Sequence, residues 1–195
     1  MDSTKWIWWG GVAAVIGGLT WMGFHLWYVM TELDLASLIV APANLRILIV
    51  SVLLFIGTLW ALRWASDASG GMKTSLMVAI MGLALMAIGL FGIAFVGVGA
   101  MWLAGIVGEL VTSIGLLIFG IANLRDGILP RFNFLPLLMV LVYLPSWMVD
   151  PGNLSPPLPP HWTEWLAAVY GLGWVALGVV LLWQRVIRSP TAVQP

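Results

Sequence analysis

The chain has 195 residues, of which 62% are hydrophobic and 8% charged, whereas soluble domains average roughly 45–50% apolar and about 25% charged residues. A soluble domain of this length could not bury so much apolar surface, so the composition predicts a chain that lies in a lipid bilayer. The net charge of zero argues against a nucleic-acid partner, and the absence of cysteine excludes disulfides, thiolate metal sites and thiol catalysis.

Six apolar stretches follow one another, and a helix needs about 20 apolar residues to cross the hydrocarbon core. Residues 75–124 are nearly unbroken and too long for one span, so we divide them at the turn Gly97-Val98-Gly99-Ala100. The fifth stretch is short and contains Pro136 and Pro145, which predicts a kinked or tilted helix. The predicted spans are about 6–30, 46–64, 75–96, 101–124, 132–148 and 162–186.

A cleaved signal peptide is the alternative interpretation of residues 6–30. This apolar stretch of about 25 residues exceeds the 7–15 of a typical signal core, and Asp2 offsets the charge of Lys5 in front of it. We therefore expect an uncleaved first helix.

The basic residues predict the orientation, because cytoplasmic loops of membrane proteins carry an excess of Lys and Arg. Arg46 alone lies in a gap of outer parity. The other seven lie in alternate gaps or at the termini: Lys5, Arg63, Lys73, Arg125, Arg131, Arg185 and Arg188. The predicted fold is therefore all-α, a single domain of six transmembrane helices in three hairpins, multi-pass in the cytoplasmic (inner) membrane with both termini cytoplasmic.

The tryptophans give an independent test of these boundaries, because indole rings favour the lipid–water interface. Only Trp21 and Trp174 lie deep within a predicted span. The remaining eleven fall at span ends, on the cytoplasmic side Trp6, Trp8, Trp9, Trp60, Trp64 and Trp183, and on the outer side Trp27, Trp102, Trp147, Trp162 and Trp165.

The three helices that return to the cytoplasm end alike, with Leu and Gly followed by Arg. This pattern is compatible with a threefold repeat of hairpins, but any apolar helix that ends on the cytoplasmic side favours the same residues. A threefold repeat and an inverted repeat of the transporter kind both stay open.

The run Gly115-Leu116-Leu117-Ile118-Phe119-Gly120, followed by Arg125 and by Leu129-Pro130-Arg131-Phe132, resembles a recurrent pattern in small bacterial multi-spanning membrane proteins of unassigned function. In those proteins a glycine-containing helix ends in Arg and the next one begins at Leu-Pro-Arg plus an aromatic residue. The resemblance covers about 20 residues. It implies a bacterial origin and brings no activity with it.

We expect Glu109 to be the only acid within a span. A carboxylate near the bilayer centre costs several kcal/mol, so such groups face the bundle interior, form pairs or stay protonated. At 1.5 Å per residue, Glu109 lies roughly 12 Å below the outer end of its helix. Small and hydroxyl-bearing residues surround it on one helix face, which favours close helix packing: Gly105, Gly108, Thr112, Ser113 and Gly115.

His25 is the only histidine within a span, on a stripe of small residues that includes Gly18 and roughly 8 Å below the outer boundary. We expect His25 and Glu109 to point into the bundle, while contact between them depends on a helix order that the sequence does not give. Arg46 begins the second span at the same outer level. It can extend towards lipid headgroups or turn inward and neutralise Glu109.

Four interpretations of this trio remain open: a buried polar cluster that fixes helix register, a proton- or cation-handling site, a quinone- or haem-related site, and residues that face lipid by accident. His161 could join His25 as a second haem ligand, although a solvated or interfacial histidine is the simpler interpretation. No metal-ligand spacing, catalytic triad or phosphate-binding loop is present in the sequence. We therefore expect no cofactor, no metal and no catalytic residue.

Three functions follow. Short loops favour a non-catalytic structural or accessory membrane component, with the lipid bilayer and other membrane proteins as its partners. The alternative is a small proton-coupled transporter or permease-like module, with Glu109 as the protonatable group and His25 as its partner. The third is an enzyme or electron-transfer subunit that uses the outer pocket.

Overall fold

A computed structural model describes residues 3–31, 42–65, 69–126, 129, 132–144 and 161–188. Those residues form helices and turns without a strand, which confirms the all-α prediction. The helices are α1 (Ser3–Met30), α3 (Pro42–Ala65), α4 (Gly70–Phe91), α5 (Trp102–Asp126), α6 (Leu135–Tyr143) and α8 (Trp162–Arg188). Five of them, all except α6, are long and apolar enough to cross a membrane by length and composition.

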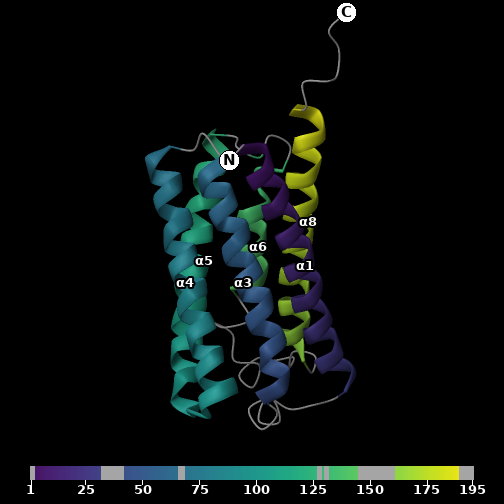
Figure 1. Cartoon of the computed structure of the whole chain (residues 1–195), viewed down its shortest axis with the longest axis vertical. Helices are drawn as coiled ribbons and strands as arrows, with labels where there is room; N and C mark the ends of the chain where they lie inside the picture. The colour runs from purple at the N-terminus through teal and green to yellow at the C-terminus, as the bar shows by residue number, and fades with distance from the viewer. Residues whose placement is uncertain are drawn as a thin grey trace, which may run out of the picture.

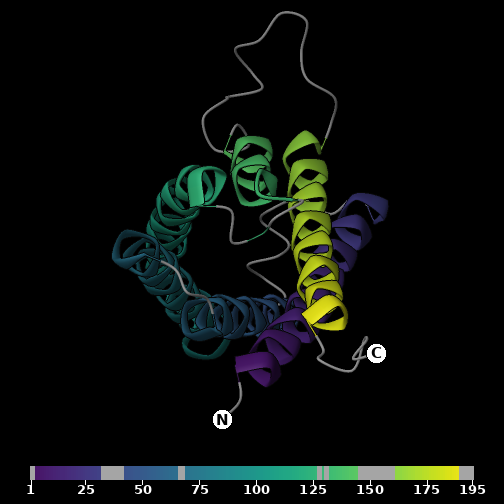
Figure 2. The same ribbon diagram turned by 90° about the horizontal axis from the view of Figure 1, so that it is seen from above.

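The six helices form a closed ring in chain order. Each helix packs against the helix before it and the helix after it, and α8 closes the ring against α1 (Figure 2). Neighbouring helices run in opposite directions, so α1 begins and α8 ends at the same end of the bundle (Figure 1). We call this the terminal end and the opposite one the distal end.

A tight turn at the distal end connects α4 to α5. The last turn of α4 widens into a π-helix, η1 (Gly92–Val96), and a 3-10 turn, η2 (Gly99–Met101), leads into α5. Gly97 between them has φ +73°, a left-handed conformation that favours glycine because other residues meet a steric penalty there. The structure therefore places the reversal in the Gly97–Ala100 segment, where the sequence predicted it.

The short helix α6 differs from its prediction. It begins at Leu135 and not at Phe132, and Pro136 lies in its first turn, where backbone N–H groups have no acceptor within the helix, so a proline there loses no hydrogen bond and favours helix initiation. Pro136 therefore starts this helix, so the predicted kink at Pro136 is wrong, while the predicted tilt stays a prediction. Asn123 of α5 holds the preceding turn: its amide donates to the Asn133 carbonyl at 2.8 Å, and its Oδ1 accepts from the Leu129 N–H at 3.2 Å. Pro145 and the proline-rich segment 150–160 lie outside the described residues.

Paired glycines let α1 and α8 approach closely. A Cβ on Gly18 would lie 2.6 Å from the Gly171 carbonyl oxygen, and one on Gly178 would lie 2.6 Å from the Gly11 carbonyl oxygen. The two glycines on each helix are seven residues apart, the spacing that keeps one seam facing a neighbouring helix. Larger residues at these positions would push the two backbones apart.

The interface between α4 and α5 uses the same device. A Cβ on Gly108 would collide with the backbone of Met86, and a Cβ on Gly115 would collide with the backbone of Ala79. Across the interface, Gly82 meets the backbone of Thr112 in the same way. Gly18, Gly108 and Gly115 thus all lie where two helix backbones approach each other most closely.

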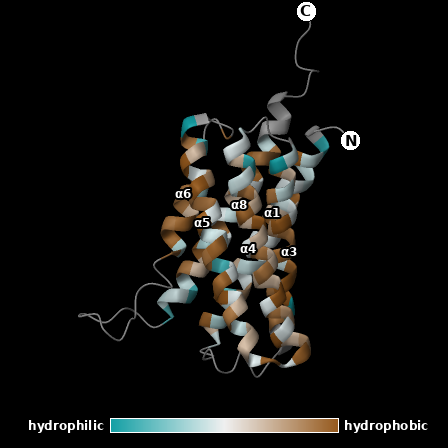
Figure 3. Cartoon of the chain, turned by 90° about the vertical axis from the view of Figure 1, so that its left-hand side faces the viewer, coloured by the Kyte–Doolittle hydropathy of each residue, from teal (hydrophilic) through white to brown (hydrophobic). Residues whose placement is uncertain are grey.

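Hydrophobic residues occur along the whole length of the helices (Figure 3), and many of them lie on the outside of the ring. Large hydrophobic side chains of every long helix are exposed there, among them Ile16, Val50, Met81, Ile114 and Val179. Exposed tryptophans lie near both ends: Trp9, Trp64 and Trp183 at the terminal end, and Trp27 and Trp165 at the distal end. The ring therefore presents an apolar band between two tryptophan-bearing rims.

Candidate functional site

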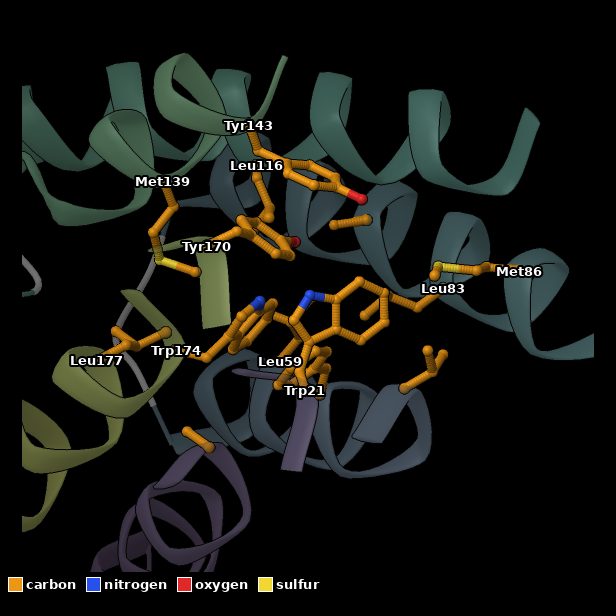
Figure 4. Packing of buried hydrophobic residues seen from close by; sticks show 14 of the residues in the cluster. Trp21, Leu59, Leu83, Met86, Leu116, Met139, Tyr143, Tyr170, Trp174 and Leu177 are labelled. Atoms are coloured by element: carbon orange, nitrogen blue, oxygen red, sulfur yellow. The ribbon is translucent and has the colours of Figure 1, made fainter. Parts of the chain in front are cut away.

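A layer of aromatic rings fills the middle of the ring of helices (Figure 4). We call it the aromatic layer, and its members come from four helices: Trp21 of α1, Phe55 of α3, Tyr143 of α6, and Tyr170 and Trp174 of α8. Phe55 stacks on Trp174 with centroids 4.1 Å apart, and Tyr143 stacks on Tyr170 at 4.5 Å. The Trp21 Nε1–H donates to the Ala167 carbonyl at 3.1 Å. These contacts fix the rings as one packed unit.

A cavity of about 250 Å³ lies between this layer and the distal end. We call it the distal cavity, and all six helices contribute to its wall. Trp21 and Tyr143 form part of its wall as well as part of the aromatic layer. The apolar wall residues come from every part of the ring: Phe24, Leu45, Leu48, Met86, Leu90, Ile93, Trp102, Ile106 and Ala167.

Glu109 of α5 lines the distal cavity and is 8% exposed. It also lines a second, much smaller cavity of about 10 Å³, together with Thr112 and Tyr170, a volume close to that needed for a single water molecule. On the same helix, Gly108 and Gly115 lie against the α4 backbone, and this close packing fixes the rotation of α5 that places Glu109 in the cavity wall. Glu109 therefore lies at the boundary between the distal cavity and the aromatic layer.

His25 of α1 lines the same cavity. Its ring packs against Trp21 and Phe24, with centroid distances of 5.1 and 5.3 Å. Its Nε2 atom is buried and has no hydrogen-bond partner among the described residues. The wall thus contains a buried nitrogen whose hydrogen-bonding capacity is unused by the neighbouring helices, an arrangement that normally costs free energy.

Arg46 lies elsewhere. Its guanidinium is over the ring of Phe95, 4.8 Å from the centroid, and both side chains are exposed on the outside of the ring. Arg46 is not part of the cavity wall. Of the two orientations that the sequence left open, the structure has the outward one.

Glu164 is the cavity residue that sequence analysis missed. It lies in the first turn of α8 and lines the distal cavity with Thr163, whose Oγ1–H donates to Glu164 Oε2 at 2.6 Å. The expectation that Glu109 is the only acid within a span is wrong, because α8 begins at Trp162 and includes Glu164. The predicted span 162–186 already contains Glu164 near its start, and an acid is favourable in the first turn of a helix.

Gly105 differs from the other glycines expected to pack helices. A Cβ on Gly89 would lie 2.5 Å from the Gly105 backbone nitrogen, so the Gly105 backbone does contact α4. A Cβ on Gly105 itself would meet nothing within 4 Å, and Gly105 lines the distal cavity. The missing side chain at this position therefore leaves room in the cavity.

His161 does not join His25. It precedes α8 with φ +58° and packs edge-on against Tyr28, with centroids 6.2 Å apart, outside the cavity wall. Within the described part of the chain, no group of three or more His, Asp or Glu side chains is arranged to hold a metal ion.

The arrangement is that of a small apolar chamber with two carboxyl groups and one imidazole in its wall. Such a chamber suits a small organic molecule, because mostly apolar walls with a few polar groups are typical of ligand sites. No known family model matches this chain, and neither a curated protein nor a solved structure is similar enough to match it. The cavity itself is therefore the basis for any functional conclusion, and the bacterial origin implied by the sequence pattern stays a prediction.

Proposed function

We propose that this chain is a six-span integral membrane protein that binds a small molecule in the distal cavity, on the outer side of the cytoplasmic membrane. The observation that supports it most is that Glu109, His25 and Glu164, from three different helices, line one cavity. A mostly apolar chamber into which a few polar groups converge is typical of a small-molecule site.

The apolar outer surface and the charges support insertion in a membrane. Four of the basic side chains described lie at the terminal end, Lys5, Arg63, Lys73 and Arg125, and only Arg46 lies at the distal end. This bias predicts that the terminal end faces the cytoplasm. The nine residues of α6 cover only about 13 Å at 1.5 Å per residue, so α6 alone is too short to cross a hydrocarbon core of about 30 Å.

Cysteine labelling tests this topology directly, because the natural chain has no cysteine. Thr31→Cys at the distal end should react with a membrane-impermeant maleimide in intact cells. Lys5→Cys at the terminal end should react only after the membrane is permeabilised. Labelling of both in intact cells, or of Lys5→Cys alone, would contradict the proposed orientation.

A glycine pair tests ligand binding. Gly105→Leu places a side chain in the distal cavity, where its Cβ would meet nothing within 4 Å. Gly23→Leu is a matched control, since Gly23 is exposed on α1 and its Cβ would also meet nothing within 4 Å. The wild type and Gly23→Leu in lipid nanodiscs should bind 2-phenylethanol or 2-phenylethylamine, measured by calorimetry. Gly105→Leu should lose this binding; equal heats for all three would reject the cavity as the site.

Proton-coupled transport is a second function, favoured by the position of Glu109 between the distal cavity and the aromatic layer. Transport requires access from both sides in turn, so the aromatic layer would have to rearrange during the cycle. Proton uptake into liposomes should be lost in Glu109→Gln, and uptake that survives this change would count against a transport role for Glu109.

The accessory role stays a prediction, and co-purification of a constant partner in mild detergent would test it.

A further inference from the structure

We infer that the ligand of the distal cavity is a small organic monocation with an apolar body, such as a protonated aryl- or alkylamine. This rests on the proposed binding function and names the class of molecule that the wall recognises. Four features of the cavity support this class of ligand: the acids of its wall, its aromatic faces, the His25 imidazole and its volume.

Apart from His25, the ionisable side chains of the wall are acids. Glu109 and Glu164 both line the distal cavity, and the described residues of its wall include neither Lys nor Arg. Arg46, the basic residue nearest in level, points outward over Phe95. Low-dielectric walls with charges of one sign concentrate the opposite charge, so an anionic ligand would be repelled and a cation attracted.

The aromatic faces favour an organic cation over a metal ion. Four aromatic side chains line the cavity, Trp21, Phe24, Trp102 and Tyr143. An ammonium group within about 6 Å of such a ring is attracted by the ring's negative face, and the same rings pack against an apolar ligand body. No group of three His, Asp or Glu side chains in the described chain is arranged for a metal, so the carboxyl groups of the wall do not converge on a single ion position.

His25 supplies a second polar contact. Its buried Nε2 has no hydrogen-bond partner among the described residues, and the residue lines the cavity. A neutral imidazole nitrogen can accept a hydrogen bond from an ammonium N–H or donate one to a hydroxyl. A ligand amine would thus use a nitrogen that has no hydrogen-bond partner in the described part of the chain.

The volume limits the size of this molecule. The cavity holds about 250 Å³, more than the ~150 Å³ of an engineered protein cavity that binds benzene and less than the ~300 Å³ at which drug-sized pockets begin. One aromatic ring with a short aminoalkyl chain fits these limits.

Three probes of similar size separate charge from shape: 2-phenylethylamine, a cation at neutral pH; 2-phenylethanol, which is neutral; and phenylacetate, an anion. In calorimetry with the full chain in nanodiscs, the amine should bind at least tenfold more tightly than the alcohol, and phenylacetate should not bind. Glu164→Gln should weaken amine binding about tenfold and change alcohol binding less than twofold, and Glu109→Gln should act in the same direction. Lys73→Gln, a change of one charge at the terminal end, should leave both affinities within twofold.

Two results would overturn the inference while leaving a binding cavity in place. One is equal affinity for the amine and the alcohol, or a preference for phenylacetate. The other is amine binding unchanged in both glutamine variants, each checked for folding by its circular dichroism spectrum. If the wild type bound none of the three probes, both the inference and the proposed binding function would be contradicted.

Discussion

The two halves of the ring interior are built from similar residues but differ in how they use them. On the side of the aromatic layer, Phe55 stacks on Trp174, and Trp174 packs edge-on against Tyr170. Towards the distal end, Phe24 and Trp102 line a cavity of about 250 Å³. The difference teaches that aromatic content alone does not produce a packed core: in one half the rings contact each other, and in the other they surround a space.

A tryptophan pair should give the largest effect. Trp174→Ala removes a ring that is 0% exposed and stacked on Phe55, so it should lower the free energy of unfolding by about 3–5 kcal/mol. Trp102→Ala should cost less than half as much, because the Trp102 ring already borders the distal cavity. Unfolding in mixed SDS micelles measures both, and equal losses would contradict the contrast between a filled and a hollow half.

Two neighbouring glycines of α5 sharpen the same comparison with a single methyl group. Gly108→Ala should lower the free energy of unfolding by about 1–3 kcal/mol through overpacking, because its Cβ collides with the Met86 backbone. Gly105→Ala should be neutral or stabilising by up to about 1 kcal/mol, since its Cβ enters open space. The same unfolding assay measures both variants. If Gly105→Ala lowered the free energy of unfolding as much as Gly108→Ala, the cavity wall at Gly105 would be as tightly packed as the interface at Gly108.

Glu109→Gln should have the smallest effect on stability, below about 1 kcal/mol. The uncharged amide of glutamine can make the hydrogen bonds that a carboxyl group accepts or donates, whereas removing one member of a buried ion pair costs about 3–5 kcal/mol. Glutamine keeps the shape and can still hydrogen-bond. A loss of several kcal/mol would mean that a charged partner lies against Glu109.

Hydropathy and glycine patterns predicted the five long helices of this fold well, because they report where the chain is continuously apolar and where it turns. The turn at Gly97 and the deep positions of Trp21 and Trp174 were all accessible from the sequence. Small residues around Glu109 and His25 also indicated that both face the bundle interior, and both line the distal cavity.

The order of the helices around the ring and the composition of the cavity wall depend on which helices contact each other, and hydropathy does not report helix contacts. The closed ring in chain order depends on backbone contacts between helices, such as that of Gly18 with Gly171. The sequence shows the glycines on each helix but does not tell which other helix they contact. Glu164 was missed because it lies near a span end, where acids are ordinary. The outward direction of Arg46 was one of two orientations that the sequence could not separate.

One labelling comparison tests most directly the claim that a water-accessible cavity lies inside an apolar, lipid-facing ring. Gly105 and Val107 are two residues apart on α5; Gly105 lines the distal cavity, whereas Val107 is exposed on the outside of the ring. A cationic methanethiosulfonate reagent reacts with thiolates, which form in water and not in hydrocarbon. In intact cells Gly105→Cys should be modified and Val107→Cys should not, whereas modification of Val107→Cys at the same rate, or of Val107→Cys alone, would contradict the account.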